Sequence, residues 1–353
     1  MIFNKLHILI FGVLVTTNLN AQILPQYKYY FEAYSEIEKM LSGREKLDFK
    51  EAVFITENAY FENQLNKEVF DFIIKDYASI CRGIINSGNI FYQEKDTVRA
   101  KAQCAVFVFM TDSFPMQTNN GIVYHKPFEY NFDDFAGQKE WSNMFVSTLM
   151  DTKKGNCHSL PFLYKMIMDE LGQKSYLSLA PNHIYIKAVN NRAKIYNIEL
   201  TCGEFPTDAW LMASGYIHID AIRNGIYMDT LNLQQSISLC MVDLAQGYRA
   251  KFGVENGYFI LKCCDTALKY FPNYINALLL KSETLTSLYK NTEPKEGKEK
   301  ILAEMNELLT HIHKLGYRKM PQEMYLHWLN SIGIMTEYRM KSLFINRNEL
   351  NNE

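Results

Sequence analysis

The sequence predicts an α+β protein, in which a helix-rich domain with a small antiparallel sheet is followed by an all-α helical domain. Three patterns lead to this prediction. Apolar residues recur at helical spacing in several segments before residue 175. Polar and apolar residues alternate over 183–188 and 194–200, as in strands with one buried face. From Met241 to Lys290 the spacing becomes that of paired helices joined by short turns.

The N-terminus is predicted to be a secretory signal peptide. Lys5 supplies the basic charge, and Leu6–Val15 forms an apolar stretch that is too short to span a bilayer. Asn18–Ala21 is similar to a small-residue cleavage site. We therefore expect removal of residues 1–21 and a periplasmic or extracellular mature protein with no stable membrane span.

The remaining chain is long enough for two domains, which we place at 22–235 and 236–353. The whole chain of 353 residues has a net charge of −2, and its lysines are spread along the sequence. This balance does not favour nucleic-acid binding. The 23 Tyr and 22 Phe favour helix packing over a dedicated carbohydrate or peptide surface.

Helical periodicity predicts four helices in the first part of the mature chain, at 26–42, 49–58, 66–86 and 96–111. Asp48 is placed to cap the second of them. Pro115–Tyr130 is rich in Asn, Gly and Pro and is predicted to be a loop, either lining a substrate cleft or only connecting helices. Phe135–Thr152 is predicted to be partly helical.

Residues 155–159, Gly-Asn-Cys-His-Ser, place a cysteine at the start of a further predicted helix. Gly155 allows a tight turn, and Asn156 and Ser159 can cap the helix. Helical spacing after Cys157 is carried by Leu160, Leu163, Tyr164, Ile167 and Leu171. The helix dipole favours a thiolate at this end, and the Cys157 N–H can stabilise an oxyanion. The alternative is a buried structural cysteine.

The alternating segments after this helix predict a hairpin. A short apolar strand at 175–180 comes first and ends at Pro181. A turn centred on Asn191 would then pair Ile184 with Ile198, so that the apolar faces of the two strands coincide.

The same pairing predicts the members of a catalytic site. His183 would lie opposite Glu199, within reach of a hydrogen bond. His183 could then take the proton of Cys157, while Glu199 fixes the orientation of the imidazole. Asn197 lies diagonally and is the alternative orienting residue. The sequence thus predicts Cys157, His183 and Glu199 as catalytic residues.

These residues resemble the transglutaminase-like superfamily, which has a papain-like cysteine-enzyme fold. The family pattern is Gly-x-Cys at a helix start, His at the start of a strand and Asp about 16 residues later, often in Asp-Pro-Thr. Here Gly155, Cys157 and His183 match, and Glu199 in Glu-Leu-Thr replaces the Asp. The resemblance covers roughly residues 50–205. It implies a cysteine nucleophile, a histidine base and an orienting acid, with Trp141, Asn143 or Asn182 as the side-chain oxyanion donor.

The other cysteines and histidines do not predict a metal site. Seven cysteines in an exported chain imply at least one free thiol, for which Cys157 is the candidate. No C-x-x-C pair is matched by a second ligand pair, and His311 and His313 alone do not make a site. We expect no metal and no cofactor.

The C-terminal part is similar to tetratricopeptide repeats, which in bacterial exported members of the superfamily follow the catalytic domain. Leu244, Gly247, Tyr248, Ala267 and Pro272 carry this spacing. A charged loop at 291–300, a helix at 301–315 and a final helix at 321–344 are expected to follow. Such repeats need stacked neighbours to bury a core, so we expect them to pack on the first domain.

Three hypotheses for function follow. The first is an enzyme that transfers acyl groups at a peptide or amide bond, with hydrolysis favoured over cross-linking. The second is a catalytically silent module whose repeats bind a peptide or protein partner. The third is a structural assembly protein. Rapid reaction of Cys157 with a thiol reagent separates the first from the second.

Overall fold

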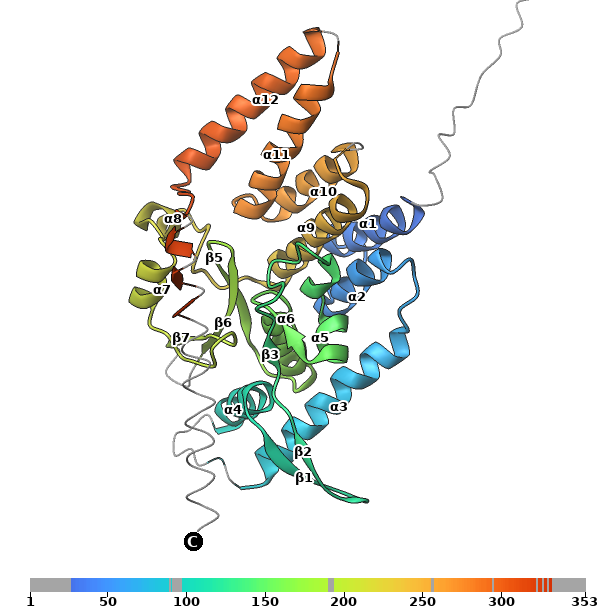
Figure 1. Cartoon of the computed structure of the whole chain (residues 1–353), viewed down its shortest axis with the longest axis vertical. Helices are drawn as coiled ribbons and strands as arrows, with labels where there is room; N and C mark the ends of the chain where they lie inside the picture. The colour runs from blue at the N-terminus through green and yellow to red at the C-terminus, as the bar shows by residue number, and fades with distance from the viewer. Residues whose placement is uncertain are drawn as a thin grey trace, which may run out of the picture.

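The computed structural model describes residues 27–88, 90, 97–189, 194–254, 257–293, 295–321, 323–325, 327–328 and 330–331. This part of the chain is rich in helices and contains three small sheets, which confirms the α+β class (Figure 1). The predicted signal peptide at 1–21 and the turn at Asn191 lie outside the described residues.

Four helices begin the described chain, close to the ranges predicted for them: α1 Lys28–Leu41, α2 Phe49–Tyr60, α3 Lys67–Asn86 and α4 Thr97–Thr111. The Asp48 side chain caps α2 as predicted, accepting a hydrogen bond from Glu51 N at 3.0 Å. Asn66 caps α3 in the same way, accepting from Val69 N at 3.1 Å. Local capping signals therefore set where these two helices begin.

The prediction of a loop at Pro115–Tyr130 is wrong. Strands β1 (Phe114–Thr118) and β2 (Gly121–His125) form an antiparallel hairpin, and β3 (Glu129–Tyr130) follows it. Thr118 pairs with Gly121 across a two-residue Asn-Asn turn, a connection that suits asparagine. The run Ile-Val-Tyr in β2 has strong strand propensity. The hairpin projects from the body of the molecule (Figure 1).

The middle of the chain is organised around a central buried helix. The 3-10 helix η2 (Trp141–Met144) and α5 (Val146–Thr152) lead to β4 (Lys154–Gly155), which pairs with β3 in parallel. Helix α6 (Ser159–Glu170) follows and is buried at every position from Ser159 to Met168. It packs against α3, α4, α5 and the next strands, and it therefore holds its N-terminus in a fixed place.

The predicted strands form a three-stranded antiparallel sheet in the order β5 (Tyr176–Ala180), β6 (His183–Val189) and β7 (Ile195–Ile198). The expected register is wrong by two residues, because Ile198 pairs with Ile186 and not with Ile184. Since side chains alternate with a period of two, a shift of two residues keeps the same faces together. Strand β6 is central and buried on both faces along nearly all its length.

The C-terminal part consists of helices: α7 Asp208–Ser214, α8 Ile219–Arg223, α9 Leu233–Phe252, α10 Gly257–Tyr270, α11 Ile275–Asn291 and α12 Lys295–Lys314. Helices α9 to α12 pack each against the next. The predicted loop at 291–300 is largely wrong, since α12 begins at Lys295 and not at Ile301. Only part of the expected final helix at 321–344 falls within the described residues.

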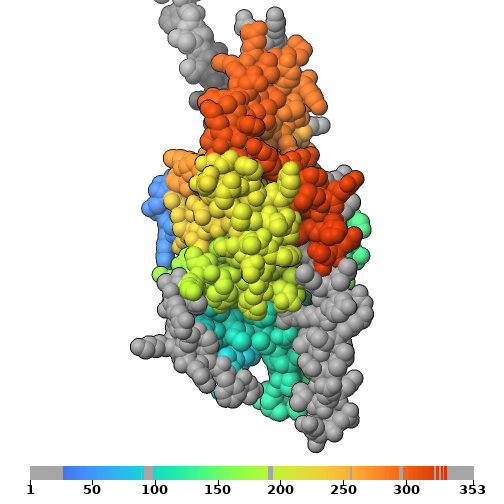
Figure 2. Space-filling view, turned by 90° about the vertical axis from the view of Figure 1, so that its left-hand side faces the viewer, coloured from blue at the N-terminus to red at the C-terminus, as the bar shows by residue number. Residues whose placement is uncertain are grey.

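One apolar core runs from the N-terminal helices to α12. Tyr248 of α9 illustrates the connection, with its ring centroid 5.3 Å from that of Tyr30 in α1 and 4.6 Å from that of Phe259 in α10. After α12 the chain returns to the first half, where Asn224 Nδ2 donates to Leu315 O at 3.2 Å. Figure 2 shows this orange-red segment on the surface beside the yellow-green α7 and α8.

Candidate active site

A tight, self-bonded turn presents Cys157 just before α6. Asn156 Oδ1 accepts from the backbone N–H groups of His158 and Ser159, both at 3.0 Å. Ser159 Oγ accepts from Asn156 N at 3.1 Å. The predicted capping roles of Asn156 and Ser159 are therefore confirmed. Cys157 lies half-buried between these bonded residues, two positions ahead of the first residue of α6.

Gly155 is required by close packing and not by an unusual backbone angle. It lies in β4, and its backbone φ angle is not positive. A Cβ atom at this position would lie 2.6 Å from Leu149 Cδ1 and 2.7 Å from Ser159 Oγ. The glycine thus allows the strand to pass directly against the cap that holds Cys157.

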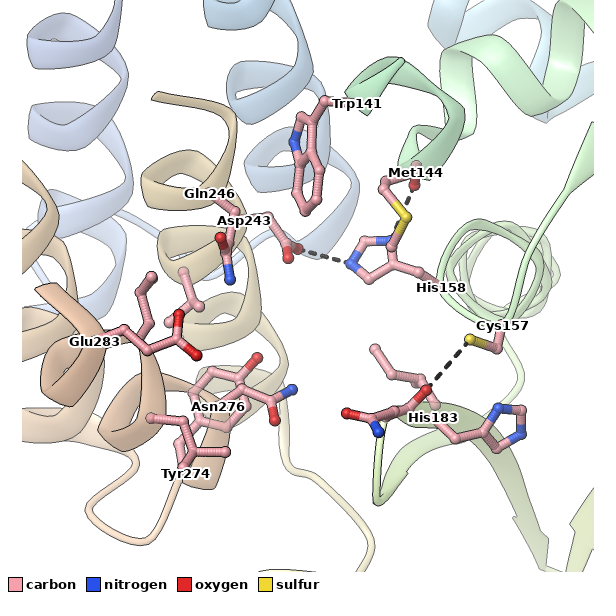
Figure 3. Close-up of a pocket in the computed structure, with 15 residues that line it drawn as sticks. Trp141, Met144, Cys157, His158, His183, Asp243, Gln246, Tyr274, Asn276 and Glu283 are labelled. Carbon is pink, nitrogen blue, oxygen red and sulfur yellow. Dashed lines mark hydrogen bonds and ion pairs between the residues drawn. The ribbon is translucent and has the colours of Figure 1, made fainter. Parts of the chain in front are cut away.

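His183 is the first residue of β6 and follows the two-residue Pro-Asn turn from β5. Ala180 pairs with His183 across this turn, and Asn182 has a left-handed φ of 54°. The Cys157 thiol donates to the Asn182 carbonyl oxygen at 3.7 Å. The turn therefore brings the imidazole and the thiol to the same end of the site (Figure 3).

Glu199 holds the imidazole from the end of β7. Its Oε2 lies 2.5 Å from His183 Nε2, while its Oε1 accepts from Thr201 N at 3.0 Å and from Thr201 Oγ1 at 2.7 Å. The predicted contact is confirmed, although the observed register makes it diagonal and not directly opposite. Asn197, the alternative, donates instead to Pro206 O and Asp208 Oδ1.

The ion pair controls the protonation of the site. Burial lowers the pKa of His183, but the charge and hydrogen bond of Glu199 and the nearby Cys157 outweigh it and raise the pKa well above the usual range. Burial raises the pKa of Glu199, yet the charge of His183 and the bonds from Thr201 lower it overall. Nε2 is committed to Glu199, whereas Nδ1 has no well-formed bond to a described residue. Nδ1 is thus the nitrogen free to exchange a proton.

A cavity of about 280 Å³ opens beside Cys157 (Figure 3). One wall comes from the turn before α6 and the Pro-Asn turn. The other comes from α9 and α11. Its described lining residues include Trp141, Met144, Asp243, Gln246, Tyr274, Asn276 and Glu283. The site therefore lies between the sheet and the C-terminal helices.

The three candidates for the oxyanion donor differ in position. Asn143 Nδ2 donates to Asp134 Oδ2 at 2.8 Å and is engaged elsewhere. Trp141 lines the cavity, but its indole Nε1 faces α9, 3.5 Å from where a Cβ of Gly247 would lie. Asn182 borders Cys157 directly. No sequence signal separated these three, because their positions depend on tertiary packing.

Aromatic residues that were not predicted lie near Cys157 and His183, outside the lining of the cavity. Tyr130 in β3 is paired with Gly155, and burial together with the charge of Cys157 raises the pKa of its hydroxyl. Trp328 is buried, with its ring centroid 5.0 Å from that of His183. Tyr325 stacks on Trp328 at 5.9 Å. Tyr130 fell in the segment predicted to be a loop, and nothing local marks Tyr325 or Trp328.

His158 is a second histidine that sequence reasoning left aside. It lines the same cavity and forms an ion pair with Asp243 of α9, with Nε2 2.9 Å from Oδ2.

No cluster of three or more His, Cys, Asp or Glu in the described chain is arranged to hold a metal ion. Within those same residues no helix has the length and apolar character to cross a membrane. All seven cysteines are described, and none is in a disulfide.

Comparison with known proteins adds little to this geometry. No family model matches the sequence, and no curated protein is significantly similar to it. A crystal structure of menin, described as revealing the binding site for the Mixed Lineage Leukemia protein, aligns with a TM-score of 0.36 and 13% sequence identity. The alignment covers 86% of this chain and 74% of menin. A likeness this slight carries no argument about fold or function.

Proposed function

We propose that this protein is an exported cysteine enzyme of the transglutaminase-like class, with acyl transfer at a peptide or amide bond as its reaction. In this proposal residues 22–235 form the catalytic domain and 236–353 a tetratricopeptide-like helical domain. The observation that supports it most is that the Cys157 thiol donates to the carbonyl oxygen of Asn182, while the next residue, His183, is paired with Glu199. These contacts lie next to a cavity large enough for part of a peptide.

The proposed reaction starts from a thiolate of Cys157 and a protonated His183. The sulfur attacks the carbonyl carbon, and the C–S bond forms as the carbonyl oxygen takes the negative charge. The C–N bond then breaks, and His183 gives its proton to the departing amine. Glu199 keeps the imidazole oriented and stabilises its charged form.

Hydrolysis completes the proposed cycle. Water loses a proton to His183 and attacks the thioester carbon, so that the C–S bond breaks and a carboxylic acid leaves. An amine in place of water would give a new amide, which is the cross-linking outcome. We favour hydrolysis over cross-linking, as in the first of the hypotheses drawn from the sequence, with peptides or proteins as substrates.

The test is the pH dependence of Cys157 alkylation in wild type and His183→Ala, read by intact mass and peptide mapping. Fast labelling of Cys157 below about pH 7 that is lost in the variant is expected for a thiolate–imidazolium pair. Cys104 is an internal control, since it is partly buried and burial raises the pKa of its thiol. An ordinary thiol profile in both proteins would overturn the enzyme proposal.

The alternative is a catalytically silent module that binds a peptide or protein partner. It is supported by the cavity walls, because α9 and α11 contribute polar and apolar side chains directly opposite Cys157. Slow alkylation together with retention of a peptide by wild type, but not by a cavity variant such as Gln246→Ala, would favour this alternative.

A further inference from the structure

Both ring nitrogens of His158 face hydrogen-bond acceptors. Nδ1 lies 3.0 Å from the backbone carbonyl oxygen of Met144, and Nε2 lies 2.9 Å from Asp243 Oδ2. A carbonyl oxygen only accepts, and so does an ionised carboxylate. Each nitrogen must therefore carry a proton to satisfy its contact, and this makes the ring an imidazolium.

The polar contacts of the ring favour the charged form more than its burial opposes it. The ring lies against Phe162, with centroids 4.1 Å apart, and only 14% of the His158 side chain is exposed. Burial lowers the pKa of His158, but the charge and hydrogen bond of Asp243 and the Met144 carbonyl outweigh it and raise the pKa. The charge of Cys157 also raises the pKa of His158.

A further acidic group that interacts with His158 is Glu57 of α2. Its carboxylate accepts from Val146 N at 2.7 Å and from Ser147 N at 2.9 Å, and so it caps α5. Burial raises the pKa of Glu57, while those bonds and the charge of His158 oppose the rise. Asp243, Glu57 and Cys157 thus face the ring from three different elements. Of the described residues that line the cavity, none is a lysine or an arginine.

We propose that His158 and Asp243 form a fixed ion pair whose imidazolium stabilises the Cys157 thiolate, so that helix α9 supplies a positioning residue for the nucleophile. This inference rests on the proposed role of Cys157. The two histidines then have separate tasks. His183 keeps Nδ1 free to exchange a proton, whereas both protons of His158 are held, so that it provides only charge.

Alkylation kinetics test the proposal in the full-length protein. Iodoacetamide is neutral, so its rate reports the thiolate and not the attraction of the reagent. We expect Asp243→Asn and His158→Gln each to slow labelling of Cys157 at about pH 6 by about tenfold, because each removes a charge that stabilises the thiolate in this proposal. Asp265→Asn removes a carboxylate that pairs with Lys281 on the neighbouring helices and should leave the rate unchanged. Wild-type rates in both His158 and Asp243 variants would overturn the proposal.

The protonation state of His158 provides a second measurement. In Cys157→Ala, imidazole ¹⁵N chemical shifts should show both nitrogens of His158 protonated at about pH 7, above the usual pKa of histidine. A neutral His158 at about pH 7 beside a fast-reacting wild-type Cys157 would overturn this inference alone. An ordinary thiol profile for wild-type Cys157 would overturn the proposed function and the inference together.

Discussion

The His183–Glu199 pair is almost fully removed from solvent, with 3% of each side chain exposed. Inside a protein, loss of one member leaves an unpaired buried charge, which typically costs about 3–5 kcal/mol. The three hydrogen bonds that Glu199 accepts satisfy both of its oxygens. The pair can therefore remain ionised in spite of its burial, and this links the reactivity of Cys157 to the charge of a single carboxylate.

Glu199→Gln should separate this charge from the shape of the side chain. Without the carboxylate, His183 loses the main influence that raises its pKa, so alkylation of Cys157 at about pH 6 should fall by about tenfold or more. Glu204→Gln is the matched control, because Glu204 bonds to Glu199 only through the backbone and its side chain is exposed. An unchanged rate in Glu199→Gln would contradict the assigned role.

The same pair should make stability depend on pH. The folded pKa of His183 lies above its usual value of 6.5, so the stabilisation is complete below about pH 6.5 and is lost as the pH rises through the folded pKa. The folded pKa of Glu199 lies below its usual value, so its contribution is lost in acid. In urea unfolding, the advantage of wild type over His183→Gln should narrow between about pH 6.5 and about pH 10. An advantage that grows over this range would refute the ion pair.

At the scale of elements, the turn between β4 and α6 is built around one glycine. Gly155 lets β4 lie directly against the Asn156–Ser159 cap. The hydrogen bonds of this cap join Asn156 and Ser159, which lie on either side of Cys157 in the sequence. The backbone of Cys157 is thus positioned by close packing and by a cap, and the thiol adds one contact of its own, to the carbonyl oxygen of Asn182.

Gly155→Ala should destabilise the protein by about 1–3 kcal/mol, because the added methyl overlaps Leu149 and Ser159. Gly83→Ala is the control: it lies in α3, where nothing comes within 4 Å of a new Cβ. That change should stabilise by up to about 1 kcal/mol. Equal changes in the free energy of unfolding for the two substitutions, measured by chemical denaturation, would show that the close packing at Gly155 does not require a glycine.

At the scale of the whole molecule, the C-terminal helices are continuous with the rest. The core includes residues of α1, α2, α6, α9, α10 and α11 without a break. Helix α9 packs on both α1 and α2, and it also carries Asp243 into the cavity. The elements that follow the sheet therefore stabilise the first half as well as lining its site.

We expect a single cooperative unfolding transition as a consequence. Because the two parts of the chain share one apolar core, neither can stay folded when the other unfolds. Tryptophan fluorescence and far-ultraviolet circular dichroism should therefore give superimposable urea curves. Two of the three tryptophans, Trp141 and Trp328, lie beside the candidate site, while the ellipticity reports mainly on the helices. Two separated transitions would mean that the C-terminal helices unfold independently.

The sequence by itself determined the features that depend on neighbours along the chain. Asp48 and the Asn156–Ser159 cap identify where helices begin, and alternation identifies β6 and β7. The contact between His183 and Glu199 also followed from alternation, because a shift of two residues leaves both side chains on the same face. Short-range hydrogen bonds and side-chain period are enough to specify these features.

Only the tertiary structure decided what approaches Cys157 from distant parts of the chain. Asp243 and the walls of α9 and α11 border the cavity, and Tyr130 and Trp328 lie near Cys157 and His183. Spacing along the sequence contains no signal for such contacts, because they depend on how whole helices pack around one core. The register of β7 was decided in the same way. Registers that differ by two residues satisfy the alternating pattern equally well, and side-chain packing selects one of them.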